Sequence, residues 1–125
     1  MPDSTPTTHT ASCHCGAVRI ELDALPDSVT ACNCSLCTCY GVLWAYCDAA
    51  QIVALPAASL TRTYAWNGRH VDFHHCAHCG CVTHWTPRDP GRVRRGINAR
   101  LFPPAVLATL RVRHRDGAGT GKYLD

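Results

Sequence analysis

The chain lacks any apolar run long enough to cross a bilayer. The best candidate, residues 41–60, is interrupted by Asp48, Gln51 and Pro56, whereas a spanning helix needs about 20 mostly apolar residues. The first eight residues have an acidic residue, two prolines and no apolar core, so they do not read as a signal peptide. We therefore expect a protein without membrane association, in the reducing environment of the cytoplasm.

The sequence also lacks repeats, an internal linker and almost all helical periodicity. Only residues 103–110 have a helical pattern, with two prolines at the start, where a first turn tolerates them. At 125 residues the chain has the size of one domain. We expect a disordered polar tail over residues 1–11, one folded domain over 12–116 and a C-terminal tail over 117–125.

What the sequence does contain is a series of short segments rich in β-branched and aromatic residues. Val18, Ile20 and Leu22 alternate with polar residues, which predicts a half-buried strand. Asn67-Gly68 stands between two such segments and predicts a tight hairpin. The expected fold is therefore mainly β. The predicted strands lie within residues 17–22, 42–46, 60–66, 71–74, 82–85 and 93–101.

Cysteine is abundant, with ten residues in 125. In a reducing compartment this number favours metal binding over disulfides. Three groups stand out, and two of them end in glycine, which permits the turn that directs neighbouring sulfurs to one ion. The groups are Cys13-His14-Cys15-Gly16, Cys32-Asn33-Cys34-Ser35-Leu36-Cys37 followed by Cys39, and Cys76-Ala77-His78-Cys79-Gly80 followed by Cys81.

The first and third groups supply two thiols each, and four thiolates make the closed tetrahedral set of a structural Zn²⁺. We therefore predict one structural zinc bound by Cys13, Cys15, Cys76 and Cys79. The alternative for these residues is that they are buried free cysteines.

The middle group predicts a second zinc of a different kind. Cys32, Cys34 and Cys37 offer three thiolates, which leave one coordination position open, as in catalytic sites. Cys39 or a nearby histidine could instead act as a fourth ligand and close the site. From the residues alone, both possibilities stay open.

The apparent basicity of the chain is weak evidence for a nucleic-acid partner. The formal charge of +3 counts every cysteine as neutral, but seven thiolates and two Zn²⁺ would add about three negative charges. The alternating residues Arg111, Arg113 and Arg115 predict a solvated strand face or, alternatively, a surface for phosphates or carboxylates. The three tryptophans predict core positions, and one of them could line a pocket beside the open zinc.

Taken in order, the three cysteine groups resemble those of the glutathione-dependent formaldehyde-activating enzyme family, which includes centromere protein V-like proteins. The resemblance extends over about residues 12–115, including the segment Gly96-Ile97-Asn98-Ala99-Arg100. It implies a β-tent fold of stacked short antiparallel sheets pinned by zinc sites, and the division into a structural and an active-site zinc described above. Arg100, in the family-like strand, is the candidate substrate anchor.

The resemblance also implies a reaction, the joining of glutathione and formaldehyde into S-hydroxymethylglutathione by a carbon–sulfur lyase. We therefore expect two Zn²⁺ per chain and a small thiol partner such as glutathione. The chain departs from the family pattern after Cys37. Basic residues are common there in the family, whereas this sequence has Thr38 and Cys39, and the lost charge counts against an anionic tripeptide.

Two other functions compete with the lyase. A non-enzymatic zinc module would use its metal only to stabilise a surface that binds protein or nucleic acid. A dithiol redox protein using C-x-x-C is disfavoured because such motifs accompany βαβ units, which the sequence lacks.

Overall fold

The computed structural model describes residues 8–66 and 68–125. The protein is mainly β, with 41% of residues in strands and 16% in helices, so the expected fold of stacked sheets is confirmed. The strands are β1 (His9–Ser12), β2 (Arg19–Leu22), β3 (Ser28–Cys32), β4 (Trp44–Asp48), β5 (Ile52–Ala54), β6 (Thr61–Tyr64), β7 (Val71–Cys76), β8 (Val82–Pro87), β9 (Arg94–Asn98) and β10 (Arg111–Arg115). The helices are α1 (Ser35–Tyr40) and α2 (Pro104–Leu107), with 3-10 turns η1 (Ala49–Gln51), η2 (Ala58–Leu60) and η3 (Ala99–Leu101).

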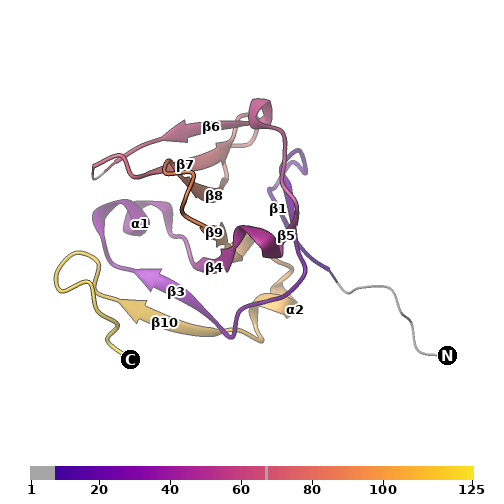
Figure 1. Ribbon diagram of the computed structural model, residues 1–125. Coiled ribbons are helices and arrows are strands. Elements are labelled where there is room, and N and C mark those ends of the chain that lie inside the picture. Colours follow the sequence, from indigo (N-terminus) through magenta and orange to yellow (C-terminus); the bar gives the residue numbers. More distant parts are fainter. Residues whose placement is uncertain (1–7, 67) are drawn as a thin grey trace.

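The strands form a small sheet in the order β1-β2-β5 and a large sheet in the order β10-β3-β4-β9-β8-β7-β6. The large sheet runs from β10 at the bottom of Figure 1 to β6 at the top, and α1 lies between its two ends. Pairing within the large sheet is antiparallel except between β10 and β3. There Arg115 is the register partner of Cys32, which brings the last strand beside the first residue of the middle cysteine group.

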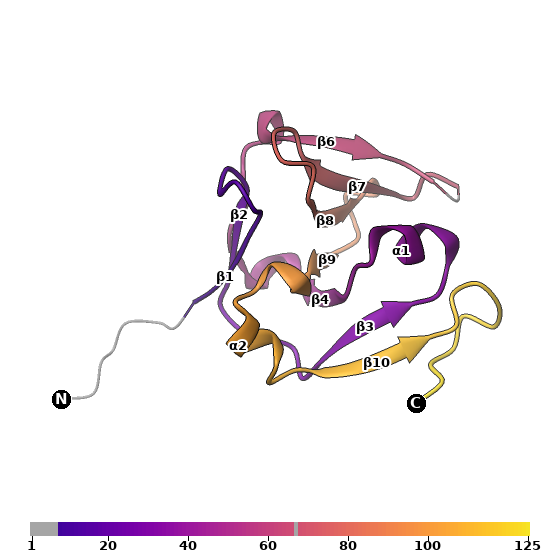
Figure 2. The same cartoon turned by 180° about the vertical axis from the view of Figure 1, so that it is seen from behind.

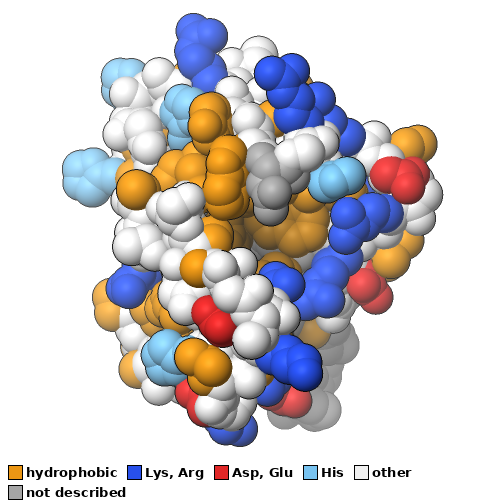
Figure 3. Space-filling view, turned by 90° about the vertical axis from the view of Figure 1, so that its left-hand side faces the viewer, with side chains coloured by type: hydrophobic (Ala, Val, Ile, Leu, Met, Phe, Trp, Pro, Cys, Tyr) orange, Lys and Arg blue, Asp and Glu red, His pale blue; other side chains and the backbone are white. Residues whose placement is uncertain are grey.

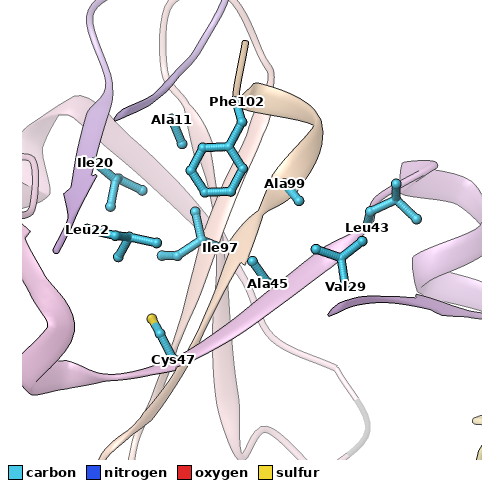
Figure 4. Close-up of a cluster of buried hydrophobic side chains, with 10 residues drawn as sticks. All are labelled: Ala11, Ile20, Leu22, Val29, Leu43, Ala45, Cys47, Ile97, Ala99 and Phe102. Atoms are coloured by element: carbon cyan, nitrogen blue, oxygen red, sulfur yellow. The ribbon is translucent and has the colours of Figure 1, made fainter. Parts of the chain in front are cut away.

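The main core lies between the small sheet and the centre of the large one (Figure 4). Val18, Ile20 and Leu22 are fully buried, which confirms the alternation seen in the sequence. Ile20 and Leu22 pack with Ile97 and Phe102, from β9 and the turn after it. Each buried side chain of this size contributes about 1.5–3 kcal/mol, so this cluster fixes β2 against β9.

Some elements were not expected from the sequence. Helix α1 was missed because it has only six residues and its pattern is dominated by cysteine. Its boundaries are set by caps, since the Cys34 sulfur accepts from the Cys37 N–H and Gly41 adopts φ +62°. Strands β1, β3 and β5 were missed as well, whereas a helix at α2 and a strand at each of the six predicted segments are present.

The predicted hairpin between β6 and β7 is present, but its turn is longer than two residues. Tyr64 pairs with Phe73 as the last register pair, and Asn67 lies outside the described residues. Gly68 and Arg69 both adopt positive φ values, which marks this connection as a left-handed turn.

Both ends of the described chain contact the body of the protein. Residues 9–12, three of which were assigned to a tail, pair with β2. At the other end Tyr123 bridges Arg115, and its hydroxyl lies 2.7 Å from that of Thr30. Figure 2 shows this C-terminal segment looping back past the end of β3. Across the described residues, no helix is both long and apolar enough to span a membrane.

Candidate metal centres

The first and third cysteine groups meet in space. Cys13 follows β1, Cys76 ends β7, and Cys15 and Cys79 lie in the turns after them. All four sulfurs lie within 4.8 Å of one another, and Cys15 Sγ is 3.6 Å from both Cys13 Sγ and Cys76 Sγ. Tetrahedral Zn–S bonds of about 2.3 Å require sulfurs about 3.8 Å apart. The donor set therefore fits a four-sulfur Zn²⁺ site.

Backbone N–H groups surround these sulfurs. Cys13 Sγ accepts from the Val18 N–H at 3.2 Å, and Cys76 Sγ accepts from the N–H groups of His78 and Cys79 at 3.4 Å each. The backbone N–H of Cys81 is the main cause that lowers the pKa of Cys79 to about 5. Such donors favour thiolate over thiol, which is the form that binds metal.

Glycines shape both turns of this site. Gly16 and Gly80 adopt φ values of +82° and +81°, and their N–H groups donate to the carbonyls of Cys13 and Cys76. A residue with a Cβ is strained in this region. The role expected for glycine after each cysteine pair is therefore present in the structure.

The middle group forms a separate cluster of three. Cys32 ends β3, Cys34 caps α1 and Cys37 lies on its first turns. Their sulfurs lie within 4.8 Å of one another. The cluster fits a Zn²⁺ with three protein ligands and one open position.

Hydrogen bonds and burial act differently on these thiols. Burial opposes ionisation of Cys34, but hydrogen bonds from the Cys37 N–H and from the thiols of Cys37 and Cys32 outweigh it and lower the pKa of Cys34. Burial raises the pKa of Cys37 to about 12, although the Trp44 indole N–H donates to its sulfur at 3.3 Å. A divalent cation among the three sulfurs would offset this burial, because it stabilises the thiolate form.

Cys39 is not part of either cluster. It follows Cys37 by two residues on α1, which turns its side chain to another side of the helix. It is exposed, and it lines a different cavity together with Tyr64 and Cys81. In the described part of the chain, both groups of candidate metal ligands consist of cysteine alone.

The three-sulfur cluster opens into a pocket of about 280 Å³. Aromatic rings form much of its wall, including Trp44 and Phe73, whose centroids are 6.0 Å apart. All three tryptophans line it, so the expectation that one of them would do so is met. The lining residues are Cys32, Cys34, Cys37, Trp44, Tyr46, Trp66, Val71, Phe73, Trp85, Arg92, Arg115 and Gly117.

The C-terminal segment closes one side of this pocket. Asn33, between two of the cysteines, donates to Asp116 Oδ1 at 2.9 Å and accepts from the Ala118 N–H at 2.9 Å. A Cβ added to Gly117 would overlap Cys32 Sγ. The backbone of this segment therefore approaches the cluster as closely as a glycine allows.

Arg100, the expected substrate anchor, is not among the residues that line the pocket. Asn98 caps the turn η3 by accepting from the Arg100 N–H, and this turn carries the side chain outward. Its Nε donates to the Gly41 carbonyl at 2.6 Å, at the end of α1. In this structure Arg100 therefore binds the C-terminal end of α1.

Sequence reasoning missed Tyr46, Arg92 and Gly117 as pocket residues. Arg115 was noted only as part of an alternating arginine strand. The signal that would have placed it is the parallel pairing of β10 with β3, which local sequence patterns do not reveal.

Two comparisons with known proteins relate the chain to others. A family model described as glutathione-dependent formaldehyde-activating enzyme matches residues 8–102. A crystal structure of a Rhodobacter sphaeroides protein is similar, with 26% sequence identity and a TM-score of 0.65, covering 82% of this chain and 98% of that one. The matched family region contains all seven clustered cysteines and ends before β10.

Proposed function

Because this chain belongs to the glutathione-dependent formaldehyde-activating enzyme family, we propose that it is a zinc-dependent carbon–sulfur lyase. It would join a small thiol such as glutathione to a small aldehyde such as formaldehyde. The reaction forms one C–S bond while the thiol proton passes to the carbonyl oxygen, so no oxidant or reductant is needed.

The observation that carries this proposal is the three-sulfur cluster on the wall of a pocket. Cys32, Cys34 and Cys37 all line the 280 Å³ pocket and would hold a Zn²⁺ that lacks a fourth protein ligand, since Cys39 does not join them. Zinc bound there would supply a Lewis acid that lowers the pKa of an incoming thiol. The four-sulfur cluster would hold the structural Zn²⁺.

The chain's own residues would position the reactants. Trp44, Phe73 and Trp85 give the pocket an apolar wall, and a low-dielectric wall strengthens polar interactions beside it. Burial raises the pKa of Tyr46 to about 12, so its phenol stays protonated at neutral pH. It is therefore available to donate a hydrogen bond to an aldehyde oxygen.

Arginines of the pocket could supply the positive charge that this chain lacks after Cys37. Arg92 and Arg115 reach the same pocket from the loop before β9 and from the end of β10. A positive charge for an anionic thiol would thus come from elsewhere in the sequence, which removes the main objection to a glutathione-like substrate.

The test compares two cysteine variants of the zinc-loaded protein. Exchange NMR would measure the rate of S-hydroxymethylglutathione formation above the spontaneous reaction. We expect catalysis by the unaltered protein and by Cys39→Ser, and none by Cys34→Ser. Equal rates with and without protein would contradict the lyase and favour a non-enzymatic zinc module, whereas loss of activity in Cys39→Ser would contradict the open site.

A further inference from the structure

A second cavity of about 390 Å³ adjoins the 280 Å³ pocket of the three-sulfur cluster. The two share Tyr46, Trp85, Arg92 and Arg115 as lining residues, so they lie side by side, and together they are called the cleft. On the face shown in Figure 3, Lys and Arg side chains gather along one side of a hollow with apolar side chains within it. The second cavity also includes Arg94, Gly121 and Tyr123.

Three arginines line this cavity without a carboxylate partner. The ion pairs found among residues 8–66 and 68–125 are Arg88–Asp72 and His114–Asp125, and neither belongs to the cavity. Arg94 instead lies 4.1 Å above the Tyr46 ring, and Arg115 Nε donates to the Gly121 carbonyl at 3.1 Å. Asp48 is the register partner of Arg94 but makes no ion pair with it. Arginines gathered without ion-pair partners favour the binding of an anion.

The sulfur cluster alone does not account for this charge. A Zn²⁺ with three thiolates carries a net charge of about −1, which one arginine offsets. Arg94 lines the second cavity and a smaller neighbouring one that also includes Asp48, but not the pocket of the three-sulfur cluster. The positive charge of the other two arginines therefore has no partner at the metal site and is available to an anionic ligand in the cleft.

We propose that Arg92, Arg94 and Arg115 form an anion subsite for the carboxylate or phosphate end of a substrate. For the thiol end of that substrate the inference rests on the proposed function, because the thiol would face Cys32, Cys34 and Cys37. The substrate class is then a small thiol with an anionic group at its far end. Thiols without such a group bind poorly.

Arg92 and Arg94 lie inside the region matched by the family model, and the rest of the subsite lies outside it. Arg115, Gly121 and Tyr123 lie beyond the region matched by the family model, which ends at residue 102. They are held in place by the pairing of β10 with β3 and by the contact of the Tyr123 and Thr30 hydroxyls. Family membership alone therefore does not fix what this cleft binds.

The test uses ligands that separate the anion from the thiol. S-Methylglutathione keeps both carboxylates and has no free thiol, and its diethyl ester has neither carboxylate. Calorimetry on the zinc-loaded full chain should show binding of the acid and at least tenfold weaker binding of the ester. Equal binding of acid and ester would overturn the proposal.

Charge-neutral variants locate the site. Arg94→Gln should weaken binding of S-methylglutathione at least fivefold, and Arg92→Gln serves as a second variant in case the first does not fold. Arg19→Gln, an exposed substitution on β2, is the control and should bind as the unaltered protein does. If both pocket variants fold and bind like the control, the subsite is refuted.

Two further arms separate this inference from the lyase and identify the anion. Cys34→Ser should lose catalysis but keep binding of S-methylglutathione; loss of both would count against an independent subsite. Inorganic phosphate that competes with S-methylglutathione, and does so less well in Arg94→Gln, would assign the site to phosphate-bearing thiols. Failure of phosphate to compete would assign it to carboxylates.

Discussion

At the scale of single residues, the close approach of Gly117 to Cys32 leaves no room for a side chain at position 117. The C-terminal segment is held there by Asn33, which lies between two of the clustered cysteines and bonds to both Asp116 and Ala118. The Asn33 side chain thus ties the segment that carries the three cysteines, residues 32–37, to the C-terminal segment. A residue with a larger side chain at position 117 must displace one of them.

We predict that Gly117→Ala weakens metal binding at the three-sulfur cluster while leaving the four-sulfur cluster unchanged. The added methyl group would overlap Cys32 Sγ, and overpacking of this kind costs about 1–3 kcal/mol. Native mass spectrometry during chelator titration should show one of two zincs leaving at lower chelator concentration.

The control for this substitution is Gly91→Ala. Its added methyl group would meet only the Asp89 side chain, at 3.3 Å, in an exposed loop. Zinc loss at the same chelator concentration in both variants would show that the Gly117 contact does not matter.

At the scale of elements, β7 and β8 carry a histidine pair, in which His84 is buried and His74 half-buried. His74 and His84 are register partners whose rings stack at 4.1 Å. His74 bonds to the hydroxyls of Thr61 and Thr86, and His84 to that of Thr83. Burial, with a smaller contribution from His74, lowers the pKa of His84 to about 3, and burial lowers that of His74.

This pair predicts a loss of stability in acid. The unfolded chain binds a proton at His84 below about pH 6.5, whereas the folded protein does not until about pH 3. The contribution of neutral His84 to the free energy of unfolding is therefore fully present above pH 6.5. It falls as the pH drops from 6.5 towards 3, by up to about 1.4 kcal/mol per pH unit. Denaturant unfolding of the protein between pH 7 and pH 5 measures this slope.

His84→Phe should flatten the slope because it removes the titrating group and keeps a ring in the stack. Zinc content must be measured at each pH, since protonation of thiolates also releases metal. An unchanged slope in the variant at constant zinc content would rule out His84 as its source.

The elements also show where sequence patterns suffice. Alternation of Val18, Ile20 and Leu22 predicted β2 because one face of that strand meets the core and the period of a strand is two. Helix α1 was not predictable in this way, because its boundaries depend on the Cys34 cap and the left-handed Gly41 rather than on an apolar stripe. The same local geometry separates Cys39 from Cys37.

At the scale of the whole molecule, the two sulfur clusters connect the chain over different distances. The first joins Cys15 to Cys76, 61 residues apart, whereas the second lies within six consecutive residues. The sequence predicted which thiols gather, because local spacing identifies each cysteine group and a closed zinc site needs four thiolates, which two pairs supply. It did not predict the pocket, because that depends on β10 lying beside β3.

This difference predicts unequal effects of losing each metal. Closing a loop of about 60 residues is worth on the order of 4 kcal/mol by chain entropy, so Cys79→Ser should unfold or strongly destabilise the protein. Cys34→Ser should cost less stability and mainly lose the second zinc. Thermal unfolding of the two variants, with zinc content measured for each, makes the comparison, and equal destabilisation would contradict it.

The pairing of β10 with β3 has a consequence for the chain during synthesis. Cys32, Cys34 and Cys37 leave the ribosome about 80 residues before Arg115, an interval of roughly 4–16 s at typical translation rates. Until β10 arrives, nothing from the C-terminal segment covers these thiols. During those seconds they are open to oxidants and to competing metals, so metal supply to the nascent chain influences how much correctly loaded protein forms.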